Sequence, residues 1–206
     1  MNKHGQITSQ LVTKRIQLFE ERTGFELIVA AGTSSDPYPG AQWRGGLLVG
    51  LALSALLLHF YAFEPRSLEV LFVGLIVALS VAAVKLSGLG RFFVLPSEAE
   101  RETWEKAQVL FSQFQSTTLG HQASILLFLS LEEHKMHLLV DQILHEKLSE
   151  SDLHEILALM RLHFRSGQFD QGLEKAIGLL EEKVLARIGK NPHPPVLAVE
   201  DRIFWF

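Results

Sequence analysis

Two long apolar stretches, separated by a short polar link, constrain this chain more than any other feature of its sequence. The first runs from residue 45 to residue 63 (GGLLVGLALSALLLHFYAF) and contains no charged side chain. The second runs from residue 70 to residue 90, with Lys85 as its only charge. At about 1.5 Å per helical residue, each stretch is long enough to cross roughly 30 Å of hydrocarbon. The pattern predicts a transmembrane helical hairpin. The alternative is a pair of unusually apolar core helices in a water-soluble protein.

Small residues occur along both stretches, and they predict how the two helices pack. Because small side chains let helix backbones approach closely in a bilayer, we expect close packing at Gly50 and Ser54 of the first helix and at Gly74 and Ala78 of the second. His59 lies four residues from the end of the first stretch. We expect its side chain to reach toward the membrane interface, and a role in a proton path is the alternative.

The charges beside the hairpin predict its orientation. Arg44, Lys85 and Arg91 flank the side that holds its two ends, whereas residues 64–69 of the link carry one arginine and two glutamates. Lysine and arginine are enriched on the cytoplasmic side of membrane helices. We therefore expect a cell (inner) membrane protein with both termini and the soluble residues in the cytoplasm. The first ten residues lack the apolar core of a signal peptide, so the hairpin itself is expected to direct insertion.

Away from the hairpin, the chain is acidic and lacks cysteine. The 206 residues carry 19 lysines and arginines against 23 acids, and residues 91–206 alone carry 12 against 17. An acidic soluble part argues against nucleic acid as a partner, because phosphates require a basic footprint. The absence of cysteine excludes disulfides, thiolate catalysis and cysteine-based metal sites. The chain also lacks a G-x-S-x-G elbow and a phosphate-binding glycine loop.

The remaining residues alternate between helical and extended patterns. A strand must pair with others to satisfy its backbone groups. We therefore expect the strand that precedes the hairpin to join the later strands in one α/β sandwich, which the hairpin interrupts. The predicted parts are 1–44, the hairpin 45–90, 91–189 and a tail 190–206. The predicted helices are 6–22, one beginning at Pro96, 141–148, 152–165 and 170–188, and the predicted strands are 25–31, 124–131 and 134–140.

Several short motifs, taken in order, resemble the TPM domain family. Residues 21–27 (ERTGFEL) are similar to the E-x-T-G-x-E-I motif that leads into the first strand of that family. Ala107, Phe111 and Thr118 resemble its A-x-x-x-F…T helix and loop, and residues 164–177 contain its F-x-x-G…G-L-x-x-A-I pattern. The chain departs from common members because the apolar hairpin follows the first strand and a glycine-rich segment is missing.

The resemblance implies an α/β/α fold and two different kinds of function. Some members of the family bind divalent metals or act as acid phosphatases, and others help to assemble or maintain membrane complexes. We expect a non-enzymatic, membrane-anchored module that binds another membrane or membrane-associated protein in assembly or quality control. The alternative is a membrane-tethered phosphatase that depends on a divalent metal. Homo-oligomers are compatible with either function.

Glu26 and Asp141 are the candidate metal ligands. Both lie near predicted strand ends, where open α/β sheets place ligands, and their oxygens suit Ca²⁺ or Mg²⁺. The alternatives are a carboxylate at the start of a strand for Glu26 and a helix cap for Asp141, and we favour the cap. The nine histidines show no metal-ligand spacing, and the Glu132–Glu133 pair is expected to form a solvated turn.

The tail ends in Phe204, Trp205 and Phe206, directly after Ile203 and the basic Arg202. Aromatic residues beside a basic residue suit a membrane interface or a groove on a partner. The alternative is that these aromatic side chains fold back onto their own domain.

Overall fold

The structure, a computed structural model, describes residues 9–60, 67–117, 124–192 and 203–206. The chain forms two compact units, one of residues 1–35 and 101–206 and the other of residues 36–100. We refer to them as the sheet unit and the hairpin unit. The predicted helix start at residue 6, the link residues 64–66 and Thr118 lie outside the described residues.

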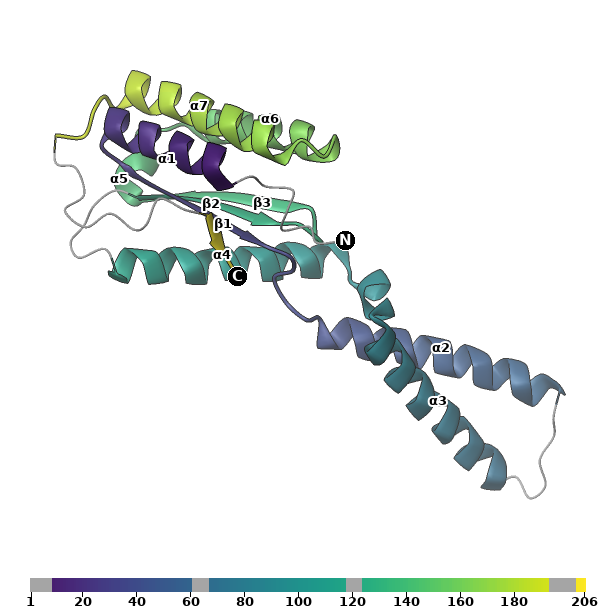
Figure 1. The fold of residues 1–206 in the computed structure, drawn as a ribbon. Helices are drawn as coiled ribbons and strands as arrows, with labels where there is room; N and C mark the ends of the chain where they lie inside the picture. The colour runs from purple at the N-terminus through teal and green to yellow at the C-terminus, as the bar shows by residue number, and fades with distance from the viewer. Residues whose placement is uncertain (1–8, 61–66, 118–123, 193–202) are drawn as a thin grey trace. The chain divides into compact units, whose positions relative to one another are not determined.

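A four-stranded sheet forms the centre of the sheet unit (Figure 1). β1 (Glu26–Gly32) pairs in parallel with β2 (Ser124–Ser130) along its full length, which confirms that the strand before the apolar stretches joins the later strands. β3 (Lys135–Val140) returns antiparallel to β2, and β4 (Ile203–Trp205) pairs in parallel with the other side of β1. The order is β3-β2-β1-β4. Every residue of β1 and β2 is buried, as expected for strands covered on both faces.

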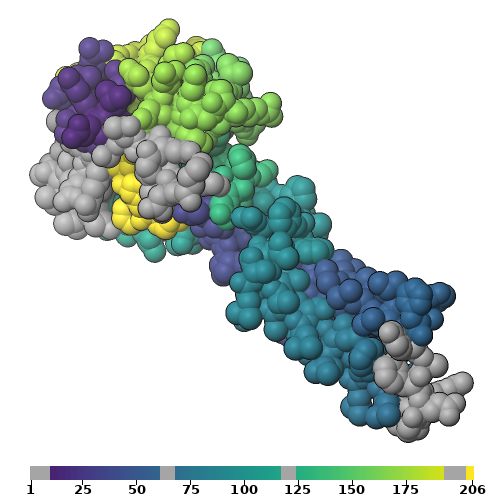
Figure 2. Space-filling view, turned by 45° about the vertical axis from the view of Figure 1, so that its right-hand side comes forward, coloured from purple at the N-terminus to yellow at the C-terminus, as the bar shows by residue number. Residues whose placement is uncertain are grey.

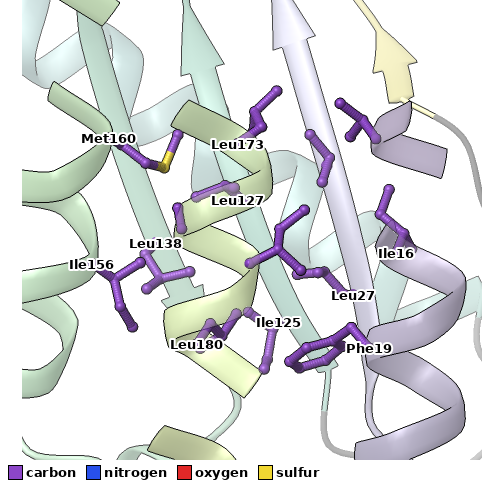
Figure 3. Close-up of a cluster of buried hydrophobic side chains, with 14 of the residues drawn as sticks. Ile16, Phe19, Leu27, Ile125, Leu127, Leu138, Ile156, Met160, Leu173 and Leu180 are labelled. Carbon is purple, nitrogen blue, oxygen red and sulfur yellow. The ribbon is translucent and has the colours of Figure 1, made fainter. Parts of the chain in front are cut away.

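Helices cover both faces of this sheet and give the α/β/α layers that the resemblance implied. The elements α1 (Ser9–Thr23), α6 (Glu150–Arg165) and α7 (Phe169–Arg187) lie on one face, and α4 (Pro96–Thr117) lies on the other (Figure 1). Because side chains alternate along a strand, Leu27 and Val29 join one core cluster while Ile28 and Ala30 join the second. The larger cluster includes Ile16, Phe19, Leu27, Ile125, Leu127, Leu138, Ile156, Met160, Leu173 and Leu180 (Figure 3).

The hairpin unit contains two helices that are long and apolar enough to cross a membrane, α2 (Pro39–Phe60) and α3 (Ser67–Ser87). A short 3-10 helix, η2 (Leu89–Phe93), follows α3. In the most apolar windows of α2 and α3, only 22% and 17% is buried. A core helix of a water-soluble protein is mostly buried, so these values argue against the core-helix alternative.

The two helices approach most closely where glycines of α2 meet valines of α3. A β-carbon at Gly46 would lie 2.4 Å from the Cα of Val81, and one at Gly50 would lie 2.7 Å from the Cα of Val77. Ser54 is also buried, and its hydroxyl donates to the carbonyl of Gly50 at 2.8 Å. The predicted packing role is therefore confirmed for Gly50 and Ser54.

The same prediction is wrong for Gly74 and Ala78 of α3. A β-carbon at Gly74 would have no other heavy atom within 4 Å, and Ala78 is exposed. Figure 1 shows the reason, since α2 and α3 diverge away from η2 and toward their far ends. The presence of small residues in both helices therefore does not reveal at which residues α2 and α3 come into contact.

Gly50 and Gly74 provide a matched pair of variants for this packing. We expect Gly50→Ala to destabilise the hairpin by about 1–3 kcal/mol, because the new methyl group meets the backbone of α3. Gly74→Ala adds the same methyl group to open space and should not destabilise it. Thermal loss of helical circular dichroism in detergent measures the difference. Equal midpoints for the two variants would contradict the close approach at Gly50.

Candidate functional site

The two predicted metal ligands lie at the same end of the sheet. Glu26 is the first residue of β1 and pairs in register with Ser124, the first residue of β2. Asp141 directly follows β3, and its N–H donates to the carbonyl of Ser124 at 3.1 Å. Glu26 and Asp141 therefore lie on either side of β2. This is the amino end of the parallel strands, whereas ligands of open α/β sheets are typically bound at the carboxyl end.

The carboxylate of Asp141 has a structural contact at the start of a helix. Its carboxylate accepts a hydrogen bond from the N–H of Gln142 and caps the short helix α5 (Gln142–His145). The preferred interpretation of Asp141 as a helix cap is thereby confirmed. Glu26 is 1% exposed and, by the alternation of β1, shares the face of Ile28 and Ala30 that α4 covers.

These two carboxylates are a poor match to a calcium or magnesium site. With β2 between their strands, their backbones lie about 10 Å apart, because neighbouring strands are about 4.8 Å apart. Ca²⁺ takes about 6–8 oxygen ligands, each at about 2.3–2.6 Å. Within the described ranges, no group of three or more histidine or acidic side chains is placed to hold a metal ion. We therefore derive no chemical step through a metal.

The carboxyl end of β1 and β2 carries a polar cluster that the sequence did not reveal. The carboxylate of Glu133 accepts hydrogen bonds from the Ser34 hydroxyl and the Ser35 N–H, both at 2.9 Å, and from the hydroxyl of Ser130. Glu133 thus fastens the β2–β3 turn to the segment that follows β1. Ser34 and Ser35 lie about a hundred residues earlier in the chain, so no local motif could have identified them as partners.

His137 and His163 of the sheet unit are buried and contact other elements of the fold. His137 lies on β3, 8% exposed, with Nε2 2.9 Å from the hydroxyl of Thr103 and its ring edge-to-face with Trp104. Nδ1 of His163 is 3.0 Å from the carbonyl of Leu159, and its Nε2 lies 3.1 Å from Nζ of Lys175. Each of these rings is engaged by its neighbours.

The ion pairs of the sheet unit are also structural. Glu181 of α7 receives Arg15 at 2.8 Å and Arg22 at 2.9 Å, which ties α1 to α7. Asp152 forms a capping box with Ser149 and pairs with Lys183 at 3.1 Å. Hydrogen bonds from the Ser149 hydroxyl and then Lys183 lower the pKa of Asp152 to about 2. The lowered pKa keeps the Asp152 carboxylate charged further into the acidic range, and hydrogen bonds within the fold account for it.

The basic residues predicted beside the membrane have different surroundings. Arg44 donates to the carbonyl of Phe93 at 2.6 Å and pairs with Glu98 at 2.8 Å. Arg91 lies over the ring of Phe92, 5.3 Å from its centroid, and Lys85 is exposed near the end of α3. His59 stacks edge-to-face on Phe60, 5.1 Å away, at the opposite end of α2.

The tail aromatics pack against their own domain. The N–H of Phe206 donates to the carbonyl of Ala31 at 3.2 Å, and its ring stacks on Phe128 at 5.0 Å. A β-carbon at Gly32 would lie 2.2 Å from that ring, so glycine leaves the space for it. Phe204 is 39% exposed and contacts Phe114 edge-to-face. The yellow C-terminal segment reaches the surface in Figure 2. A partner interface at Phe204, Trp205 and Phe206 stays a prediction.

Variants of Asp141 separate the cap from a metal ligand. We expect Asp141→Ala to lower the free energy of unfolding by about 1 kcal/mol and Asp141→Asn to retain it, because asparagine caps helices as well as aspartate does. Thermal unfolding with Ca²⁺, Mg²⁺ or chelator measures both effects. A cation-dependent rise in the unfolding midpoint that Asp141→Asn and Glu26→Gln both abolish would contradict the structural role and establish a metal site.

Comparisons with known proteins agree with this architecture. A family model for the TPM domain matches residues 91–183. The NMR structure of the BA42 protein from the psychrophilic bacterium Bizionia argentinensis is similar over 97% of this chain and 95% of that one, with a TM-score of 0.57 at 11% sequence identity. At that identity the likeness concerns the fold alone. No curated protein matches the chain. The resemblance to the TPM domain family noted in the sequence is therefore confirmed by the family-model match over residues 91–183.

Proposed function

We propose that α2 and α3 cross a membrane as a hairpin and anchor a TPM domain that binds another membrane or membrane-associated protein. The observation that carries the membrane part is the distribution of side chains around the hairpin. Large apolar residues point outward, among them Leu48 at 56% and Leu71 at 69% exposed, while Gly46, Gly50 and Ser54 are buried between the helices. Water-soluble proteins rarely expose an apolar surface of this extent, whereas hydrocarbon solvates it.

The cytoplasm is the proposed location of both termini and of the sheet unit, in an inner membrane. Support comes from Lys85 and Arg91, both exposed near the two close ends of the hairpin. Basic residues in this position favour retention on the cytoplasmic side during insertion. The link between α2 and α3 then lies outside the cytoplasm.

The proposed partner surface includes the exposed edge of the tail. Phe204 lies on the short edge strand β4 with its ring against Phe114. An exposed aromatic side chain on an ordered strand can contact a partner with little loss of side-chain entropy on binding. Aromatic residues are also enriched at protein interfaces. Asp141, Glu133, Asp152 and Glu181 serve in caps, turns and ion pairs. We therefore favour binding, in the assembly or quality control of a membrane complex, over catalysis.

The absence of cysteine makes the orientation directly testable. In spheroplasts, a membrane-impermeant maleimide should label Pro65→Cys in the link but label Ser151→Cys on α6 only after lysis. The protein should stay in the membrane pellet after alkaline carbonate extraction. Release by carbonate would contradict the membrane hairpin, and labelling of Ser151→Cys in intact spheroplasts would reverse the proposed orientation.

Photocrosslinking tests the partner surface. We expect benzoylphenylalanine in place of Phe204 to give adducts of defined mass with membrane-fraction proteins in living cells. The same residue in place of Leu162, 67% exposed on α6, serves as the control because it lies on the same unit away from β4. Phe204→Ser should retain the fold and reduce co-purification of the captured partner. Equal adduct yields at positions 204 and 162 would contradict a specific surface at the tail.

A metal-dependent phosphatase is the alternative that the family resemblance implied. It requires Glu26 and Asp141 to share a cation, and the cation-dependent unfolding of the Asp141 variants decides it. A cation shift that both substitutions abolish would shift the proposal toward that activity.

A further inference from the structure

One end of the hairpin unit is built from segments that pack tightly together. A β-carbon at Gly45 would lie 2.4 Å from the ring of Phe93, and one at Gly90 would lie 2.6 Å from the side chain of Gln42. Residues 42–45 of α2 and residues 90–93 of η2 therefore share one level of the hairpin. Gly88, with φ of 70°, ends α3 and lets the chain turn into η2.

Large apolar side chains project outward at this level. Trp43 is 60% exposed and Phe92 is 72% exposed, and Leu89 and Leu95 are about half exposed. Phe93, next to Phe92, instead lies against Gly45. The short helix thus turns one aromatic ring inward and presents the other outward, continuous with the apolar surface of α2 and α3.

The basic side chains near this end of the hairpin unit differ in whether a carboxylate pairs with them. Arg44 is engaged by Glu98 and by the carbonyl of Phe93, so its charge is used within the unit. Arg91 and Lys85 are exposed, and no carboxylate among the described residues pairs with either. Arg91 lies against the exposed ring of Phe92 at 5.3 Å. A guanidinium over an aromatic face keeps its charge and its outward N–H donors available.

We propose that η2, with Trp43, Leu95 and Lys85, forms an interfacial anchor that binds the headgroups of anionic phospholipids through Arg91 and Lys85. This proposal depends on the proposed membrane hairpin, and it specifies the class of lipid that the hairpin binds. Tryptophan and phenylalanine beside basic residues match the boundary between acyl chains and headgroups. Phosphate provides the negative charge, and a guanidinium binds it with two parallel hydrogen bonds.

A lipid is favoured over a protein partner because the surface is continuous with the apolar hairpin. It also combines exposed aromatic side chains with Arg91 and Lys85, which pair with no carboxylate in the described part of the chain. A basic residue near an anionic surface contributes about 1 kcal/mol, which corresponds to about a fivefold change in affinity. Phosphatidylcholine carries the same phosphate, but its choline cation offsets that charge, so it attracts Arg91 less strongly than phosphatidylglycerol does. The proposal therefore predicts a preference for phosphatidylglycerol that is lost when the guanidinium is removed.

The experiment compares the full-length Arg91→Gln variant with Arg161→Gln, which removes the same charge from the exposed face of α6. Each protein is placed in vesicles of phosphatidylcholine, or of equal parts phosphatidylcholine and phosphatidylglycerol, and bound lipids are counted by native mass spectrometry. We expect the wild type and Arg161→Gln to retain phosphatidylglycerol preferentially. Arg91→Gln should weaken that retention about fivefold and leave phosphatidylcholine adducts unchanged. Equal retention of the two lipids by the wild type, or equal losses in the two variants, would overturn the proposal.

Spin labels separate failure of the anchor from failure of the hairpin. In the cysteine-free chain, a label at Leu53→Cys should collide with dissolved oxygen and not with a water-soluble nickel chelate. A label at Leu89→Cys should be accessible to both, as expected at the interface. Nickel accessibility at position 53 would overturn the membrane hairpin. If the label at position 53 collides only with oxygen while the label at position 89 is as accessible to the nickel chelate as a label in water, the interfacial anchor alone would be overturned.

Discussion

The parallel pairing of β1 with β2 is the interaction on which the rest of the fold depends. Parallel strands cannot be joined by a tight turn and need a crossover, usually a helix, between them. Here the crossover contains α2, α3, η2 and α4, and α4 then covers one face of the sheet that it helped to form. Seven residue pairs, from Glu26 with Ser124 to Gly32 with Ser130, hold the two halves of the sheet unit in register. Without that ladder, residues 9–32 would lack a core to join.

The same pairing explains where the polar residues of the sheet unit go. Burial of β1 and β2 on both faces leaves room for charge only at the strand ends. At the amino end, Asp141 caps α5 beside Ser124, and at the carboxyl end Glu133 binds Ser34, Ser35 and Ser130. These carboxylates satisfy backbone and hydroxyl donors, which stabilises turns that would otherwise leave such groups unpaired. The polar contacts of Asp141 and Glu133 thus follow from the need to satisfy backbone and hydroxyl groups where the buried strands end.

Periodicity and turn residues allowed much of this fold to be predicted from the sequence, because they act locally. The strand at 124–131 and the helices near 152–165 and 170–188 fall within a few residues of the observed elements, since burial imposes their apolar patterns. The strand β4 was not predicted, because a three-residue edge strand carries too short a pattern. The cluster around Glu133 and the divergence of α2 from α3 at Gly74 depend on residues distant in sequence. Contacts between residues far apart in the sequence determine both features, and local sequence patterns do not reveal which distant residues come into contact.

Arg44 and Arg91 show why counting charges beside an apolar stretch does not tell how many of those charges are paired within the fold. Both are arginines beside an apolar stretch, and both enter equally into an orientation rule based on charge. In the structure, Arg44 is neutralised by Glu98 and held by the Phe93 carbonyl, where it joins α2 to the segment after η2. Arg91 is exposed, and its described contact is the aromatic ring of Phe92 instead of a carboxylate. The close contacts at Gly45 and Gly90 fix this division, since they turn Phe93 inward and leave Phe92 with Arg91 exposed. Any larger residue at these glycines would disturb the packing that separates the structural arginine from the exposed one.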